Sequence, residues 1–336
     1  MRRLLPLALI ALIAAAQPGS DISASFSEYD PLSSNAVLAE RLVPPLAGEL
    51  AQRELASRGQ MLADQPLNLA AEEFRLFVPA QQPAGGYGLM VFVPPWPEAT
   101  VPPQWKSALA KRGMIMATMA RAGNAEPVLG RREPLAILAA VNVMKRYRIN
   151  PARVYVGGFS GGSKVAQRLA LGYPDLFRGA LLLAGADPLG EPGLAPPSLA
   201  LFSLFRSAAS VVLVTGAQDA VNIEQVRNAA AAMRRFCVQP AGMLVVPGMG
   251  HALINESWFT AALDRLDRPS RFERGADAPC LTKLRAGIDR DLDRIEVLIA
   301  RGQNDTARRK LLEIDARFGG LAMPRSRELL HRIDAG

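Results

Sequence analysis

Short apolar runs alternate with amphipathic stretches along the middle of the chain. The runs have strand length, and the stretches between them carry apolar side chains at helical spacing. Strands that alternate with helices predict an α/β fold, a mostly parallel central sheet with helices on both faces. We expect strands at 73–78, 89–93, 114–119, 154–158, 180–184, 211–215 and 243–246, and helices at 105–112, 133–147, 163–171, 223–236 and 257–266.

The alternating region is preceded and followed by segments of different character. Residues 35–58 have helical spacing that is interrupted at Val43-Pro44-Pro45, where proline removes a backbone donor. From Leu281 onward, leucines alternate with charged residues. The chain is therefore predicted to consist of an N-terminal helical and extended segment, an α/β catalytic domain and a C-terminal helical extension, at 17–71, 72–268 and 281–336.

The C-terminal extension has the pattern of a helical hairpin. Leu284, Ile288 and Leu292 are spaced for one helix face, a break follows at 302–305, and a second helix covers 306–318 before a third short one. The hairpin resembles a single tetratricopeptide-like unit. One such unit cannot bury its apolar face alone, so we expect it to dock on the α/β domain or on a partner protein.

The first residues match a secretory signal peptide, 1–16. Arg2 and Arg3 precede an apolar run, and Ala14-Ala15-Ala16 provides a small-residue cleavage site. The run is short for a membrane span, although an uncleaved anchor is the alternative. We therefore expect a periplasmic or extracellular protein with no stable membrane insertion after the signal peptide is cleaved.

The most informative stretch is the strand 154–158, which leads into Gly158-Phe159-Ser160-Gly161-Gly162 and then a helix. A Gly-x-Ser-x-Gly turn between a strand and a helix is typical of the nucleophile elbow of α/β-hydrolases, which lifts a serine hydroxyl above the sheet. Gly158 and Gly162 keep side chains out of the turn, and the Gly161 N–H can face an oxyanion. The alternative is an ordinary glycine-rich turn before a helix.

A serine nucleophile needs a base and an orienting acid, which follow the serine in the order acid, then histidine. Of the two histidines, His251 lies in a glycine-rich loop after a strand, whereas His331 lies in a helix-like segment where it is solvated. Asp219 lies in the turn that follows the strand 211–215 and is the favoured acid. Asp187, one strand earlier, is the competing acid, and an N-cap role is the structural alternative for Asp219.

From about residue 72 to 266 the chain resembles the secreted esterase and polyhydroxyalkanoate-depolymerase-like branch of the α/β-hydrolases. The resemblance is carried by 154–162, Thr215-Gly216-Ala217-Gln218-Asp219, Pro247-Gly248-Met249-Gly250-His251 and the stretch 173–185. It implies an α/β-hydrolase fold and hydrolysis of an ester-containing substrate, either a polymer, a cell-wall ester or a small acyl compound.

The turn after the strand 89–93 departs from that resemblance. Such enzymes usually have a His-Gly turn that supplies the second oxyanion donor, whereas this chain has Pro94-Pro95-Trp96-Pro97. Proline has no N–H, so Trp96 is the one residue of the turn whose backbone can complete an oxyanion hole with Gly161. Loss of such a donor costs roughly 10²–10³ in rate, so this turn also favours a weak or inactive hydrolase.

Other residues near the expected site are candidates for substrate contact. These are Trp105 and Asn124, although packing is an equal alternative for the tryptophan. The apolar segment 198–206 is either a lid over the acyl group or, as slightly favoured, a crossover helix.

Composition narrows the function classes. The net charge is +8, but the arginines are scattered and not interleaved with aromatic residues, so nucleic-acid binding is not expected. The two cysteines, Cys237 and Cys280, are expected to form a disulfide in an oxidising compartment. One usable histidine and two distant cysteines do not make a zinc site, so neither a metal nor an organic cofactor is expected.

These observations favour an exported serine hydrolase of the carboxylesterase or depolymerase type. Its predicted catalytic residues are Ser160, His251 and Asp219, with Gly161 and Trp96 in the oxyanion hole. One alternative keeps the fold and makes the enzyme a peptidase or acyl-aminopeptidase. The other is a non-catalytic envelope binding protein on the same fold.

Overall fold

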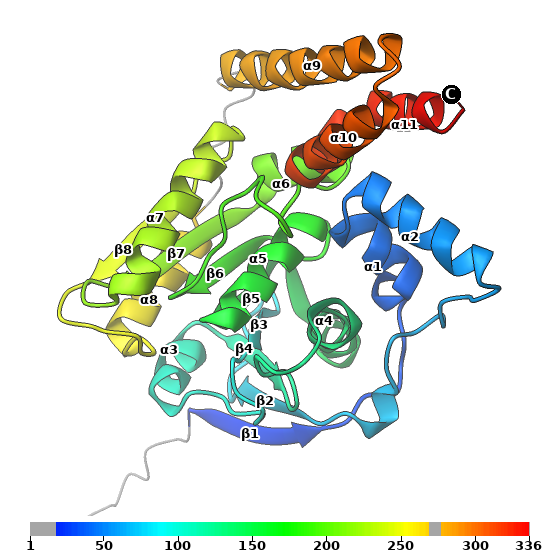
Figure 1. Ribbon diagram of the computed structural model, residues 1–336. Coiled ribbons are helices and arrows are strands. Elements are labelled where there is room, and N and C mark those ends of the chain that lie inside the picture. Colours follow the sequence, from blue (N-terminus) through cyan, green and yellow to red (C-terminus); the bar gives the residue numbers. More distant parts are fainter. Residues whose placement is uncertain (1–17, 269–276, 336) are drawn as a thin grey trace, which may run out of the picture.

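A twisted sheet of eight strands forms the centre of the computed structural model, which describes residues 18–268 and 277–335 (Figure 1). The strand order is β1-β2-β4-β3-β5-β6-β7-β8. Strands β3 to β8 are parallel to one another, and β2 runs antiparallel to both β1 and β4. The strands are β1 (Gly19–Ala24), β2 (Phe74–Pro79), β3 (Tyr87–Val93), β4 (Met114–Met119), β5 (Ile149–Phe159), β6 (Gly179–Leu183), β7 (Ser210–Gly216) and β8 (Gly242–Val246).

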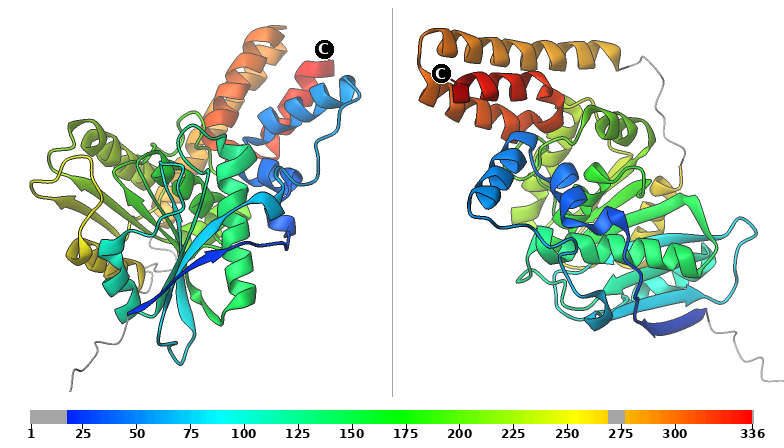
Figure 2. Two further views of the ribbon diagram at one scale, coloured as in Figure 1. Left: turned by 90° about the horizontal axis from the view of Figure 1, so that it is seen from below. Right: turned by 90° about the vertical axis from the view of Figure 1, so that its right-hand side faces the viewer.

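Helices cover both faces of the sheet, as the alternating pattern predicts (Figure 2). Side chains of α3 and α8 pack in the apolar cluster on one face, and those of α4, α5, α6 and α7 in the larger cluster on the other. With this strand order, the fold is that of an α/β-hydrolase. The helices are α1 (Asn35–Leu42), α2 (Pro45–Ser57), α3 (Lys106–Lys111), α4 (Glu133–Arg146), α5 (Gly161–Gly172), α6 (Leu199–Ala208), α7 (Ala220–Arg235), α8 (Glu256–Leu266), α9 (Ala278–Ala300), α10 (Asn304–Phe318) and α11 (Arg325–Ala335).

Two features differ from the sequence expectations. The N-terminal segment contributes an edge strand, β1, that the sequence pattern did not predict. Only its last residue, Ala24, is buried, so the strand is held by backbone pairing with β2 more than by an apolar face. Strand β5 also begins five residues earlier than the apolar run, because its first part is half-exposed and carries Asn150 and Pro151.

The segment that was expected as either a crossover or a lid is the crossover. Helix α6 connects β6 to β7, and its Phe202 and Phe205 are buried in the same cluster as α5. The turn before α11 lies against the N-terminal end of α6. A Cβ atom at Gly320 in this turn would be 2.4 Å from the Pro197 carbonyl oxygen. Helix α6 therefore lies between the sheet and the C-terminal helices.

The C-terminal helices dock on the rest of the chain, as their apolar spacing predicts. Ile288, Leu292 and Leu311 join the large apolar cluster, together with Leu46 of α2. The predicted disulfide between Cys237 and Cys280 is present and ties the start of α9 to the end of α7. Beside it, Arg206 of α6 forms an ion pair with Asp277 and donates to the Cys237 carbonyl oxygen over 3.2 Å.

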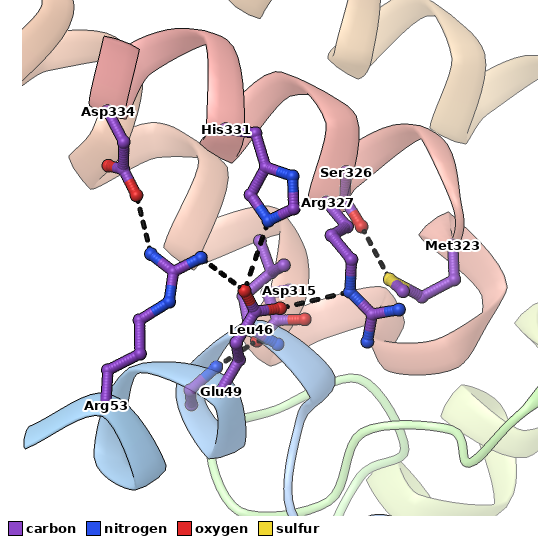
Figure 3. A network of polar contacts seen from close by, with 10 residues as sticks. Leu46, Glu49, Arg53, Asp315, Met323, Ser326, Arg327, His331 and Asp334 are labelled. Carbon is purple, nitrogen blue, oxygen red and sulfur yellow. Dashed lines mark hydrogen bonds and ion pairs between the residues drawn. The ribbon is translucent and has the colours of Figure 1, made fainter. Parts of the chain in front are cut away.

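Asp315 of α10 makes the most buried polar contact of this interface (Figure 3). One carboxylate oxygen accepts from the backbone N–H groups of Leu46 (3.1 Å) and Ala47 (3.0 Å), at the start of α2. The residue before α2, Pro44, offers no side-chain cap, so α10 supplies the cap. Burial raises the pKa of Asp315, and the two hydrogen bonds offset part of that rise.

Around this cap, charged side chains of α2 and α11 form a surface network. Glu49 accepts from Arg53 (2.5 Å) and Arg327 (3.0 Å), and His331 lies 3.2 Å from it. Arg53 also bonds Asp334 over 2.7 Å. His331 was expected to be solvated, and its side chain is 55% exposed.

Candidate active site

Ser160 occupies a strained turn between β5 and α5. Its backbone has φ 55° and ψ −122°, in the left-handed half of conformational space that non-glycine residues rarely adopt. The turn is held from both sides, since the Ser160 N–H donates to the Leu183 carbonyl (2.8 Å) and its carbonyl accepts from Ser163 N–H (3.0 Å). Strain of this kind is kept only where the surroundings enforce it, and it is concentrated at functional sites.

Close backbone contacts explain the glycines of the turn. A Cβ atom on Gly158 would lie 2.2 Å from the Gly162 carbonyl oxygen, and one on Gly162 would lie 2.0 Å from the Val93 carbonyl oxygen. The loop after β6 approaches equally closely, because a Cβ atom on Gly185 would lie 2.5 Å from the Ser160 carbonyl oxygen. The prediction that Gly158 and Gly162 keep side chains out of the turn is confirmed.

Three side chains from the carboxyl ends of three strands meet at this turn. His251 Nε2 lies 3.0 Å from Ser160 Oγ, and His251 Nδ1 lies 2.8 Å from Asp219 Oδ2. Since an ionised carboxylate only accepts, Nδ1 carries the imidazole proton and Nε2 accepts from the serine hydroxyl. The structure thus brings the three predicted residues into one hydrogen-bonded chain, with the geometry of a nucleophile, a base and an orienting acid.

Asp219 is both the N-cap of α7 and the partner of the histidine. Its Oδ1 accepts from the side-chain amide of Asn222 (2.8 Å) and, more weakly, from the Asn222 backbone N–H (3.4 Å), which leaves Oδ2 for His251. Burial favours a higher pKa for Asp219, but the hydrogen bonds from Asn222 and His251 outweigh it and lower the pKa. The N-cap alternative and the acid role are therefore compatible, because each uses a different oxygen.

The competing acid, Asp187, does not reach the histidine. Its Oδ1 pairs with Lys164 Nζ (2.8 Å) and accepts from Gln225 Nε2 (2.9 Å). The Gln167 side chain holds its backbone, accepting from the Asp187 N–H (2.8 Å) and donating to its carbonyl (2.7 Å). Asp187 therefore belongs to a separate polar cluster beside the elbow.

The loop that carries His251 is exposed to solvent on one side and packs on aromatic residues on the other. The His251 side chain is 41% exposed, and its ring packs on Phe159 with 4.8 Å between ring centroids. Three residues later, the Ile254 carbonyl accepts from the indole N–H of Trp105 over 2.8 Å. Trp105 also stacks on Phe259 of α8, at 4.4 Å between centroids.

Trp105 was expected to contact substrate, and that prediction is wrong. Its side chain is 0% exposed, and its one polar atom is used inside the protein. The apolar position at the start of the helix 105–112 is a core position, and the indole supports the loop of His251 from below. Neither Trp105 as a support nor Asn222 as a partner of Asp219 was recognised from the sequence, although an asparagine three residues after an N-cap aspartate is a visible signal.

The turn Pro94–Pro97 lies next to the elbow with its carbonyl groups occupied. The Pro95 carbonyl accepts from Asn124 N–H (3.0 Å), the Pro97 carbonyl from Arg121 N–H (2.6 Å) and the Pro94 carbonyl from the Arg132 guanidinium (3.1 Å). Within residues 18–268 and 277–335, the backbone N–H groups of Trp96 and Gly161 donate to no acceptor. They are the two donors that the sequence pattern assigns to an oxyanion hole.

Asn124 is the other predicted contact residue, and it lies at the site. It is exposed, and its side-chain amide occupies the space beside Gly161, where a Cβ atom would be 2.2 Å from Asn124 Oδ1. Any larger residue at 161 would displace this amide. Asn124 therefore places a polar group beside Gly161, the residue that follows Ser160.

In the part of the chain that the structure describes, no cluster of three or more histidine, cysteine or acidic residues is arranged to hold a metal ion. In the same part of the chain, every helix is too short or too polar to cross a lipid bilayer.

Comparisons with known proteins give only distant similarities. No family model matches the chain, and no curated protein matches it. One similar solved structure is a CE1 ferulic acid esterase from Anaeromyces mucronatus, with 15% identity and a TM-score of 0.43, covering 58% of this chain and 83% of that one. A second is a feruloyl esterase module from Clostridium thermocellum, with 12% identity and a TM-score of 0.44, covering 60% of this chain and 86% of that one. A third is dipeptidyl peptidase 4 of Porphyromonas gingivalis, with 14% identity and a TM-score of 0.43, covering 59% of this chain and 33% of that one. The chain spans about a third of the length of the peptidase. These similarities are too distant to assign a family or a reaction to this chain.

Proposed function

We propose that this protein is a serine hydrolase that cleaves carboxylic esters through a covalent acyl-enzyme. The observation that carries the proposal is the continuous contact from Ser160 through His251 to Asp219, at 3.0 and 2.8 Å. A strained elbow serine with a neutral imidazole at hydrogen-bond distance is the arrangement that activates a hydroxyl nucleophile. The elbow geometry and the buried acid support the same role.

In the proposed reaction, Ser160 Oγ attacks the acyl carbonyl while His251 Nε2 takes the hydroxyl proton. Asp219 holds the imidazole through Nδ1 and stabilises its positive charge. The N–H groups of Gly161 and Trp96 stabilise the oxyanion. His251 then returns the proton to the leaving alcohol, and water releases the acyl group from Ser160 by the reverse sequence.

We assign Asn124 to substrate contact within this proposal, because its amide is exposed beside Gly161. The resemblance to secreted esterases and polyhydroxyalkanoate depolymerases supports an ester as the bond that is cleaved. The N-terminal pattern of residues 1–16, which lie outside the described residues, supports export to the periplasm or the medium. The disulfide Cys237–Cys280 is of the kind that persists in such oxidising compartments.

The test is covalent labelling of the purified mature protein by a fluorophosphonate probe, read by intact mass. We expect one adduct on the wild type and none on Ser160→Ala. Ser57→Ala, which removes an exposed hydroxyl at the end of α2, should label at the wild-type rate. Hydrolysis of short-chain chromogenic esters should fall by about 10⁴-fold or more in Ser160→Ala.

Three results would change the proposal. A folded wild type that takes no adduct would contradict a hydrolase and leave a non-catalytic binding protein on this fold. Faster cleavage of peptide amides than of esters would replace the esterase with a peptidase. Release of soluble acids from polyester films, absent with Ser160→Ala, would sharpen the substrate to a polymer.

A further inference from the structure

Asn222, in the first turn of α7, contacts two members of the proposed triad. Its side-chain Nδ2 lies 2.8 Å from Asp219 Oδ1 and 3.0 Å from His251 Nδ1. The short contact with a carboxylate oxygen identifies this atom as the NH₂ group, because a carboxylate accepts and an amide oxygen cannot donate to it. Asn222 is half-buried, so the contact is partly shielded from water.

Helix capping does not require this side chain. In a capping box, the third residue of the helix accepts from the backbone N–H of the N-cap. Here the Asp219 N–H already donates to the Gly216 carbonyl over 3.2 Å. The Asp219 side chain also accepts from the backbone of Asn222, and any residue at 222 would provide that N–H. The amide of Asn222 is thus free to donate to the carboxylate.

We infer that Asn222 is a positioning residue that fixes which oxygen of Asp219 faces the histidine. By donating to Oδ1, it holds the carboxylate so that Oδ2 accepts the Nδ1 proton of His251. With Oδ2 facing the ring at 2.8 Å, the Nδ1 proton has a carboxylate acceptor, which favours the Nδ1–H tautomer. The Asn222 NH₂ group, itself a donor, makes no hydrogen bond to the protonated Nδ1. Nε2 then remains free to accept the proton of Ser160.

The alternative tautomer shows why this matters. If the proton moved to Nε2, Asn222 Nδ2 could donate to the bare Nδ1, and Nε2–H would face the serine oxygen as a donor. Ser160 would then have no base. In wild-type protein the carboxylate excludes this state only while its oxygen faces the ring, so the orientation that Asn222 maintains also decides the tautomer.

The test compares Asn222→Leu with Asn222→Ala. Leucine keeps the volume and removes the donor, so it separates hydrogen bonding from packing. We expect both variants to lose about 10-fold in kcat for ester hydrolysis and in labelling rate, with KM within about twofold, since a hydrogen bond to a charged group is lost. Asn228→Ala is the matched control, because Asn228 is an exposed asparagine on the same helix, and it should behave as the wild type.

A second readout does not depend on activity. The chain contains two histidines, so ¹⁵N-histidine labelling gives one signal set for His251 and one for His331 as an internal reference. The wild type should show the Nδ1–H tautomer at His251 with a slowly exchanging proton. Asn222→Leu should shift His251 toward a mixture of tautomers and leave His331 unchanged.

The inference rests on the proposed hydrolase function. The two readouts distinguish a failure of that function from a failure of the role assigned to Asn222. An unlabelled, folded wild type would overturn the hydrolase, while the tautomer of His251 would still report on Asn222. Wild-type kcat together with an unchanged His251 tautomer in Asn222→Leu would overturn the positioning role. Restoration by leucine of what alanine loses would assign Asn222 to packing and overturn it as well.

Discussion

The elbow around Ser160 and the helical layer formed by α9, α10 and α11 are stabilised in opposite ways. At the elbow, Gly158 and Gly162 lie so close to neighbouring backbone atoms that neither position has space for a Cβ atom. In the helical layer, contacts come from residues far apart in sequence, such as Asp315 with Leu46 and Cys237 with Cys280. The elbow therefore tolerates no added atom, whereas the helical layer depends on a few long-range bonds.

This difference separates activity from stability. A change at the elbow moves the nucleophile itself, and misplacement by a fraction of an ångström is costly in rate. A change in the helical layer removes stabilising contacts at a distance from Ser160, so the triad should keep its geometry as long as the protein is folded. Substitutions in each region can test that separation.

The largest effect is expected from Gly162→Ala. The new Cβ atom would meet the Val93 carbonyl oxygen at 2.0 Å, so the turn or β3 must move. We expect about a 10³-fold loss of ester hydrolysis and a destabilisation of about 3 kcal/mol, measured by initial rates and urea unfolding.

Gly287→Ala is the matched change in α9, where no neighbouring atom blocks a side chain. It should stabilise the protein by about 0.5–1 kcal/mol and leave the rate unchanged. Equal rates for the two variants would contradict the contrast between the regions.

Removing the disulfide should affect stability without affecting the reaction. The bond closes a sequence separation of 43 residues and joins α7 to α9. A Cys237→Ser, Cys280→Ser double variant should lose about 2–4 kcal/mol of unfolding free energy and keep its kcat. Urea unfolding with and without reductant measures the loss, since reductant should destabilise the wild type and not the double variant. A large fall in kcat at a temperature where the variant is folded would show that α9 reaches the site.

Asp315→Ala should have a smaller effect, again on stability alone. It removes the cap of α2, which is worth about 1–2 kcal/mol. Asp315→Asn keeps an oxygen for the N–H groups of Leu46 and Ala47 and should lie closer to the wild type. Chemical unfolding of the three proteins gives the comparison.

The stability difference between the wild type and Asp315→Asn should depend on pH in one direction. Burial raises the pKa of Asp315 in the folded state, so the folded protein binds this proton more tightly than the unfolded chain does. The contribution of the Asp315 proton to the unfolding free energy is fully present below the aspartate pKa of the unfolded chain, about 3.9. It is lost as pH rises through the pKa of Asp315 in the folded protein. The wild type should therefore gain stability relative to Asp315→Asn as pH falls from neutral. A relative loss would mean that the cap prefers the ionised carboxylate.

The smallest effect is expected from Trp105→Phe, which links a core position to the site. Phenylalanine keeps an aromatic ring against Phe259 and loses the indole donor to the Ile254 carbonyl. We expect about 1 kcal/mol of destabilisation and a fall in kcat of about two- to fivefold, because one hydrogen bond that holds the His251 loop is lost. KM should not change. An increase in KM alone would contradict the supporting role and would indicate that Trp105 contacts the substrate.

Much of the fold and three site residues could be predicted, because their signals are local. The alternation of apolar runs and helical stretches predicted every strand of the parallel part of the sheet. The glycines around Ser160 indicated the elbow because a sharp turn of this kind needs them within five residues. The edge strand β1 carries no such signal, since it pairs through its backbone and buries little apolar surface.

The site is less predictable where it depends on the direction of side chains. Asp187 and Asp219 both follow strands, and sequence could only favour one. In the structure Lys164 and Gln225 bind Asp187, while the N-terminus of α7 holds Asp219 against His251. The roles of Trp105 and Asn222 depend in the same way on which atoms lie within hydrogen-bond distance.

The sequence by itself determined the alternation of strands and helices between β2 and α8, the elbow, and the identity of the single histidine on a strand-end loop. These follow from periodicity and turn chemistry within a few residues. Only the tertiary structure decided which acid reaches His251, that Trp105 is a support, and that α10 caps α2 through Asp315. Those contacts join residues brought together by packing of the whole chain, and no local pattern encodes the distance between them.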